Sequence, residues 1–199
     1  MDSNLTGLAL LDAYAVGGQA VYLERARQLA EDIVRQHRNA GGGFNDISAT
    51  GPASLQYPVT VLTQNANVAS FFVRLADLSG DMAYRKTAHW ALRRFPNSHR
   101  TYEAFAAGFG HALGRLLVLP LIMTITGAPG DAGVRSLARA ALTQLHHGDL
   151  VLRFQADGKR QTAGAEVQVD GRLVGPIADP ASLRPEVLTT LHDTRKGIV

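Results

Sequence analysis

Apolar residues recur at helical spacing through the first half of the chain and predict two pairs of helices. In the first pair, an apolar segment from Leu5 to Tyr14 ends at Gly17-Gly18, and a second helix then continues to the glycines at 41–43. The second pair consists of residues 67–78, a Ser79-Gly80 turn and residues 84–95. A glycine just past a helix tolerates the left-handed cap conformation, so each pair predicts an antiparallel αα-hairpin.

The two predicted hairpins are repeats of one another, offset by 62 residues. The matching positions include a glycine, a tyrosine four residues later and an alanine four residues after that. These are Gly18, Tyr22 and Ala26 in the first copy and Gly80, Tyr84 and Ala88 in the second. We expect the tyrosine of each copy to pack between the two helices of its hairpin.

The periodicity changes from helical to strand-like after a third helical segment, residues 102–117. Alternating β-branched residues, glycine-rich turns and apolar runs then predict a β-α-β unit, a further strand and a last helix. These elements are expected over residues 121–126, 132–145, 150–154, 165–169 and 180–191. The pattern therefore predicts a mainly α protein with a small β-α-β appendage at its C-terminal end, divided into domains 1–118 and 119–199.

A long connection of 23 residues, Phe44 to Ala66, separates the two hairpins and is rich in Ser, Thr, Asn, Gly and Pro. Connections of this length are often functional. A short β-ribbon carrying residues 57–61 across the hairpins is an equally good interpretation. Both alternatives stay open at this point.

Composition and charge exclude several classes of protein. The 199 residues include 46% apolar residues, which suits a folded core, and no cysteine, which excludes disulfides and thiolate metal sites. The 20 Lys and Arg residues exceed the 17 Asp and Glu residues by three, and both signs alternate along the helices, as on solvated faces. We therefore expect no nucleic-acid binding. The longest apolar run, Leu116 to Met123, is far below the roughly 20 residues of a membrane span, so we expect no membrane segment and a cytoplasmic protein.

The sequence contains no recognisable catalytic constellation. Its seven histidines lack metal-ligand spacing, and the adjacent His146 and His147 would point about 100° apart on a helix. We expect His111 to lie in a core or groove, and we predict no metal and no cofactor. Four carboxylates that could serve in catalysis, Asp46, Asp77, Asp81 and Glu103, lie near helix ends, where capping explains them. No catalytic residue is predicted.

The order of motifs resembles the family of thioredoxin-domain-containing proteins related to spermatogenesis-associated protein 20. The resemblance rests on Gly42-Gly43-Phe44 after a helix and on Asn65 opening a helix that ends in Val73-Arg74-Leu75-Ala76. It also rests on Gly80-Asp81 with Tyr84 and on residues 165–180. The resemblance implies a partial (α/α)6 toroid of the six-hairpin glycosidase type, related in fold to sugar epimerases, of which this chain would be the last portion.

Two departures weaken the transfer of an activity from that family. Pro58 stands where the family has a carboxylate, although Tyr57 and Asn65 match. Gln168 and Leu173 stand where the family has two cysteines, so thiol chemistry and metal binding are not implied there.

Two hypotheses for function follow. Two hairpins cannot close a ring, so an apolar face would be left for the β-α-β unit, a second copy or a separate chain to cover, and we favour self-association. In the first hypothesis, the chain is a toroid fragment, not catalytic alone, that acts through assembly or partner binding. In the second, it forms part of a carbohydrate-binding or epimerase- or glycosidase-like groove. The groups expected to bind a neutral sugar are Tyr57, Gln64, Asn65 and Asn67.

Overall fold

The computed structural model describes residues 2–48, 57–97, 99–128, 130–145, 150–156, 163–169 and 172–196. The chain divides into two compact units. The first comprises Met1–Tyr14 and Ala20–Leu119, and the second comprises Ala15–Gln19 and Pro120–Val199. Each unit is described separately below.

The two predicted helical hairpins are confirmed. The first consists of α1 (Ser3–Gly17) and α2 (Ala20–His37), and the second of α3 (Leu62–Ser79) and α4 (Ala83–Leu92). Gly18 and Gly80, the matching glycines of the repeat, both have positive φ angles, of 65° and 78°. Gly80 caps α3 by donating its N–H to the Ala76 carbonyl, which explains why a glycine follows the first helix of each hairpin.

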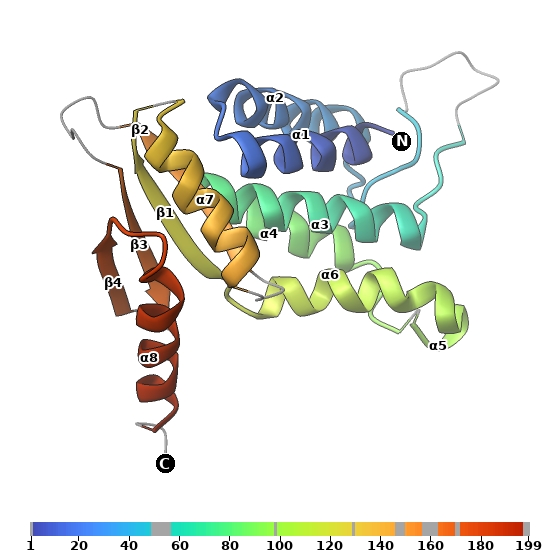
Figure 1. Ribbon diagram of the computed structural model, residues 1–199. Helices are drawn as coiled ribbons and strands as arrows, with labels where there is room; N and C mark the ends of the chain where they lie inside the picture. Colours follow the sequence, from blue (N-terminus) through green and yellow to red (C-terminus); the bar gives the residue numbers. More distant parts are fainter. Residues whose placement is uncertain are drawn as a thin grey trace. The chain divides into compact units, whose positions relative to one another are not determined.

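Helix α3 forms the centre of the first unit. It lies between the α1–α2 hairpin on one side and α4 and α6 on the other (Figure 1). Its side chains are buried along most of its length, and the Phe71 and Phe72 rings are fully buried. A side chain at Gly7 of α1 would clash with the Phe71 ring, 2.5 Å from its Cε2 atom. The lack of a side chain at Gly7 therefore lets α1 lie close to α3.

The third helical segment is interrupted rather than continuous. It consists of α5 (His99–Tyr102), a 3₁₀ helix η2 (Glu103–Ala106) and α6 (Ala107–Leu117). Glu103 has a φ of 45°, which a continuous α-helix does not allow. The predicted single helix over 102–117 is therefore correct only for its second part.

A buried ion pair connects α3, α4 and α6. Arg85 of α4 donates to Asp77 Oδ1 of α3 at 2.8 Å, and both side chains are about nine-tenths buried. The same guanidinium donates to the Leu116 carbonyl at 2.8 Å, where the last carbonyls of α6 lack helical partners. Arg85 therefore neutralises a buried carboxylate and caps a helix at once.

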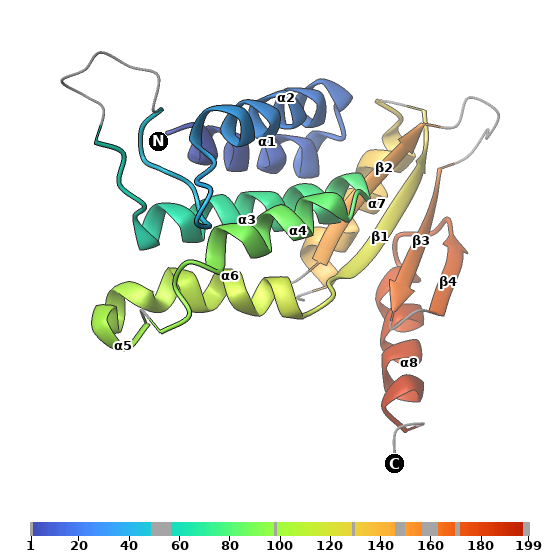
Figure 2. The same cartoon turned by 180° about the vertical axis from the view of Figure 1, so that it is seen from behind.

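The second unit contains a four-stranded mixed sheet with the order β2-β1-β3-β4 (Figure 2). Its elements are β1 (Leu121–Gly127), α7 (Ala132–Gln144), β2 (Leu150–Ala156), β3 (Gly164–Val169), β4 (Arg172–Ile177) and α8 (Leu183–Lys196). Strand β1 pairs parallel with β2 and antiparallel with β3, which pairs antiparallel with β4. Strands β1 and β2 with α7 are the predicted β-α-β unit.

The prediction of a partial (α/α)6 toroid with a small β-α-β appendage is wrong. The strands form a larger sheet that has its own hydrophobic core, to which α7 and α8 contribute. Met123, Ile125 and Val167 alternate with more polar residues and face these helices. Strand β4 was missed because Gly175 and Pro176 are unfavourable in strands. At the edge of the sheet, β4 tolerates both.

In the part of the chain that the structure describes, no helix combines the length and the apolar character that a membrane crossing requires.

The Arg85–Asp77 pair yields a stability prediction. We expect Asp77→Ala to lower the free energy of unfolding by about 3–5 kcal/mol, because it leaves a buried guanidinium without its counter-charge. Asp12→Ala, which breaks the ion pair between Arg74 and the 65%-exposed Asp12, is the control and is expected to cost less than about 1 kcal/mol. Urea unfolding measures both. Equal effects of the two substitutions would contradict a structural role for the buried pair.

Candidate functional site

The four residues predicted to bind a sugar differ widely in their exposure to solvent. Tyr57 is 82% exposed, whereas Asn65 is completely buried. Gln64 and Asn67 are half-buried and lie one turn apart on α3. Gln64 Oε1 is buried and has no hydrogen-bond partner in the described residues.

Asn65 anchors the loop that precedes it instead of facing a ligand. Its Oδ1 accepts a hydrogen bond from the Phe44 N–H at 2.6 Å, and its Nδ2 donates to the Phe44 carbonyl at 2.9 Å. Nδ2 also donates to the Val61 carbonyl at 2.9 Å. The amide is buried and its oxygen and nitrogen are bonded to backbone partners, which does not favour a contact with a sugar; the sugar-binding role of the four residues stays a prediction.

The predicted connection between the hairpins is partly ordered by other amides. Asn39 donates to Asn45 Oδ1, which also accepts from the Thr60 hydroxyl at 3.0 Å. Asp46 Oδ1 accepts the Val59 N–H at 2.8 Å. Residues 57–61 form no strand, so the β-ribbon interpretation is not supported there, and residues 49–56 lie outside the described part.

Three of the four carboxylates considered for catalysis have structural partners. Asp77 pairs with Arg85, and Asp46 accepts the Ile47 and Val59 N–H groups. Asp81 accepts the Ala83 N–H at the start of α4, as expected for a carboxylate near a helix end. These three side chains therefore have structural roles.

The described residues offer no metal site. No group of three or more His, Asp or Glu side chains in them could hold a metal ion. His111 is exposed on α6, so its predicted position in a core or groove is wrong, and His146 and His147 lie outside the described residues. The N-terminus of a helix can bind a phosphate group. At the start of α7, however, the Asp131 carboxylate already accepts the Gly133 N–H.

An open apolar pocket of about 270 Å³ lies between the two hairpins. Its floor is Phe72 of α3, and its walls are the second helices of the two hairpins, α2 and α4. The lining residues are Ala30, Glu31, Val34, Arg35, Phe72, Tyr84 and Thr87. We call this the α2–α4 groove. The two charged side chains lie on the α2 wall, and Arg35 is paired with Asp32.

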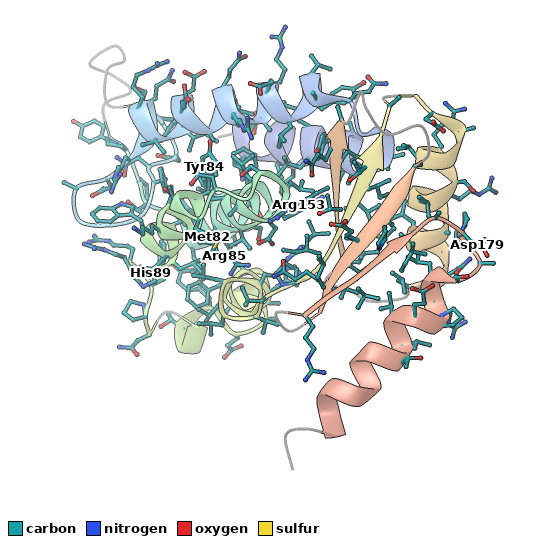
Figure 3. All side chains as sticks on the ribbon, turned by 90° about the vertical axis from the view of Figure 1, so that its left-hand side faces the viewer. Met82, Tyr84, Arg85, His89, Arg153 and Asp179 are labelled. Carbon is teal, nitrogen blue, oxygen red and sulfur yellow. The ribbon has the colours of Figure 1, made fainter. Side chains whose placement is uncertain are left out.

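Tyr84 brings an aromatic ring and a hydroxyl to the groove. Its ring packs on Phe72, with 6.0 Å between the centroids, as expected for the tyrosine of the repeat. Figure 3 shows Tyr84 on the side of α4 that faces α2, whereas Arg85 is directed towards α6. Burial raises the pKa of Tyr84 above its ordinary value of 10.0. Arg27 opposes this shift, and Asp81, Glu31 and Glu24 reinforce it.

Three arginines lie where α2 and α4 end. Arg38 directly follows α2, and its guanidinium carbon is 4.3 Å from the centroid of the Trp90 ring of α4. The Arg93 guanidinium carbon is 3.8 Å from the same centroid, and Arg94 lies beside Gly41. The Gly43 N–H donates to the Trp90 carbonyl at 2.9 Å. The contacts of Trp90 therefore close the groove at this end by connecting α2, α4 and the glycine turn.

No protein-family model matches the chain, and no curated protein is significantly similar to it in sequence. The resemblance to the thioredoxin-domain-containing family therefore stays a prediction.

The sequence pattern did not identify the groove residues, because their spacing is that of ordinary core positions. Ala30, Val34 and Phe72 have the spacing of buried helix faces. The repeat was the available signal, since it identifies α2 and α4 as equivalent helices on two neighbouring hairpins. Trp90, the only tryptophan of the chain, marks the end of the groove.

The role of Asn65 can be tested by its removal. We expect Asn65→Ala to lower the free energy of unfolding by about 2–3 kcal/mol, because it leaves buried backbone groups of Phe44 unpaired. The emission of Trp90 should shift to longer wavelength, because the loop that contacts it loses its anchor. Asn67→Ala, at a half-buried position two residues further on, is the control and should change stability by less than about 1 kcal/mol. Denaturant unfolding followed by tryptophan fluorescence measures both effects, and unchanged Trp90 emission in Asn65→Ala would contradict the anchoring role.

The raised pKa of Tyr84 predicts a pH-dependent contribution to stability. Burial favours the neutral phenol in the folded state, so the contribution is fully present below pH 10 and is lost as the pH rises through the folded-state pKa. The difference in unfolding free energy between the wild type and Tyr84→Phe should therefore decrease from pH 9 towards pH 11. Urea unfolding across this range measures the difference. A constant or increasing difference would contradict the assignment.

Proposed function

We propose that the helical unit is a non-catalytic binding module that holds an apolar side chain of a partner protein in the α2–α4 groove. The observation that carries this proposal is a pocket, open at the surface and lined mainly by apolar atoms, in which the half-buried Val34 and Tyr84 lie over the fully buried Phe72. An apolar surface left accessible between helices gains free energy when a partner side chain excludes water from it.

The size of the groove favours a side chain over a cofactor. Small-molecule pockets usually have volumes of about 300–1,000 Å³ and enclose most of the ligand. The α2–α4 groove, at about 270 Å³ and open, is better suited to one anchoring side chain of a larger partner. Helical segments often bind in this way, with their apolar face in a groove between helices.

The chemistry of the groove supports binding rather than catalysis. Glu31 is the one carboxylate among its lining residues, so the groove lacks the pair of carboxylates that glycoside hydrolysis requires. We therefore include in the proposal that this chain is not catalytic alone.

The carbohydrate alternative has weaker support. Asn65 is completely buried and its amide is bonded to the Phe44 backbone, whereas Tyr57 is 82% exposed. A neutral sugar would need several free hydrogen-bonding groups around an aromatic ring, whereas the α2–α4 groove is mainly apolar. Self-association and a cytoplasmic location stay predictions from the sequence.

The proposal predicts that filling the groove abolishes binding. The probe is a phage-displayed library of random 16-residue peptides selected on the full chain. We expect the enriched peptides to share an apolar anchor, and Val34→Trp to weaken their binding by about tenfold or more, because the indole occupies the space of the anchor. Isothermal titration of synthetic copies of the enriched peptides measures the affinities.

The matched control is Gln36→Trp, which adds the same side chain at an exposed position of α2, on the opposite face of the helix. It should leave the affinity unchanged. Thermal unfolding establishes that both variants are folded at the temperature of the titration. A selection without enriched peptides, or peptides that bind Val34→Trp as tightly as the wild type, would overturn the proposal. Titration of monosaccharides that gave heat sensitive to Val34→Trp would replace it with the carbohydrate alternative.

A further inference from the structure

The arginines at the closed end of the α2–α4 groove have no acidic partner in the described residues. Arg27, Arg35, Arg74 and Arg85 each form an ion pair in the described residues, whereas Arg38, Arg93 and Arg94 form none there. Residues 49–56, which lie outside the described part, contain no Asp or Glu. Asp46, the nearest carboxylate along the glycine turn, accepts backbone N–H groups with its Oδ1 atom. Among the described residues, these three positive charges are therefore without a neutralising carboxylate.

The structure holds two of these guanidinium groups in place without using their hydrogen-bonding capacity. Arg38 and Arg93 both lie over the Trp90 ring. A guanidinium that contacts an aromatic face can still donate N–H groups in its own plane. Stacking thus orients the donors and lowers the conformational entropy that binding an anion would cost.

The glycine turn contributes to this arrangement. Gly42 has a φ of 104°, which disfavours any other residue. A side chain at Gly42 would also come within 3.1 Å of Arg93 Nε. Gly42 therefore leaves the space in which Arg93 lies against Trp90.

An apolar groove next to free guanidinium groups indicates the chemistry of the occupant. We infer that the α2–α4 groove binds an acidic amphipathic segment of a partner protein. Its apolar side chain would lie against Val34 and Tyr84, and its Asp or Glu carboxylates would lie at Arg38, Arg93 and Arg94. This inference rests on the proposed function and adds to it the charge of the partner. Bidentate pairing with carboxylates is the contact that guanidinium groups favour, and charge complementarity supplies specificity.

An acidic peptide fits these features better than a nucleic acid does. Arginines alone would suit phosphates as well as carboxylates. However, the adjoining pocket is apolar, and a sugar-phosphate chain has no apolar group to fill it. Trp90, already contacted by two guanidinium groups, is also less available for stacking on a base.

The experiment compares a charged and a neutral form of one peptide on the full chain. The probe is the tightest peptide from the library selection and a copy in which each Asp or Glu is replaced by Asn or Gln. We expect the selected peptides to carry acidic residues beside the apolar anchor, and the neutral copy to bind the wild type about tenfold more weakly. The affinity for the acidic form should fall as the salt concentration rises.

Substitution of the arginines should remove this discrimination. We expect the double variant Arg38→Gln/Arg93→Gln to bind the acidic and neutral copies with equal affinity, a result that a merely structural role of the arginines would not produce. Arg25→Gln is the control for the loss of one positive charge, because it removes that charge from an exposed position on the face of α2 opposite to the groove. It should still bind the acidic form about tenfold more tightly than the neutral copy, as the wild type does. Should the double variant fail to fold, Arg94→Gln serves instead, at an exposed position, and should reduce the discrimination severalfold.

The outcomes separate this inference from the proposed function. If enriched peptides bind the groove and are blocked by Val34→Trp, but their neutral copies bind equally well, the groove function stands and the acidic partner is overturned. A single-stranded oligonucleotide that competes with the peptide and loses affinity in Arg38→Gln/Arg93→Gln would also overturn it, in favour of a nucleic acid. Discrimination that persists in the double variant would exclude Arg38 and Arg93 as its source.

Discussion

The hydrogen bonds between the Asn65 amide and the Phe44 backbone are the constraint on which the binding end of the helical unit depends. They hold Phe44 in the interior, where its ring stacks on Phe72 at 6.0 Å. Phe44 in turn forms a β-bridge with Arg38, and the adjacent Gly43 bonds to Trp90. One buried amide thus determines the path of the loop, and the loop brings Arg38 to the end of α4. Buried amides that satisfy backbone groups commonly specify such irregular segments, because no regular ladder is present to do so.

The helical unit combines a hydrophobic centre with several polar contacts at helix ends. Phe71 and Phe72 are buried in the middle of the bundle, whereas Arg85, Asp81 and Gly80 cap or pair groups near the ends of α6, α4 and α3. Burial supplies most of the stability of such a bundle, and the capping contacts decide where each helix stops. The groove lies between α2 and α4, where the side chains of the two helices leave part of their facing surfaces uncovered.

The local order of elements could be predicted from the sequence, but long-range pairing could not. Helical periodicity and the glycines at 18 and 80 indicated both hairpins, and the strands β1, β2 and β3 were also expected. Strand β4 and the four-stranded sheet were missed, because pairing between β3 and β4 depends on tertiary contacts that override the unfavourable Gly175 and Pro176. At the site, the pattern identified Asn65 but assigned it to a ligand, since an amide that bonds to distant backbone looks the same in sequence as one that faces solvent. Arg38 and Trp90, 52 positions apart, gave no local signal of their contact.

The repeat also allows the two walls of the groove to be compared. They are the second helices of the two matching hairpins, yet the side chains that they present differ in chemistry. Glu31 and Arg35 line one wall, and Tyr84 and Thr87 line the other. A partner in the groove would therefore meet charged groups on one side and hydroxyl groups on the other, so its two sides are not interchangeable.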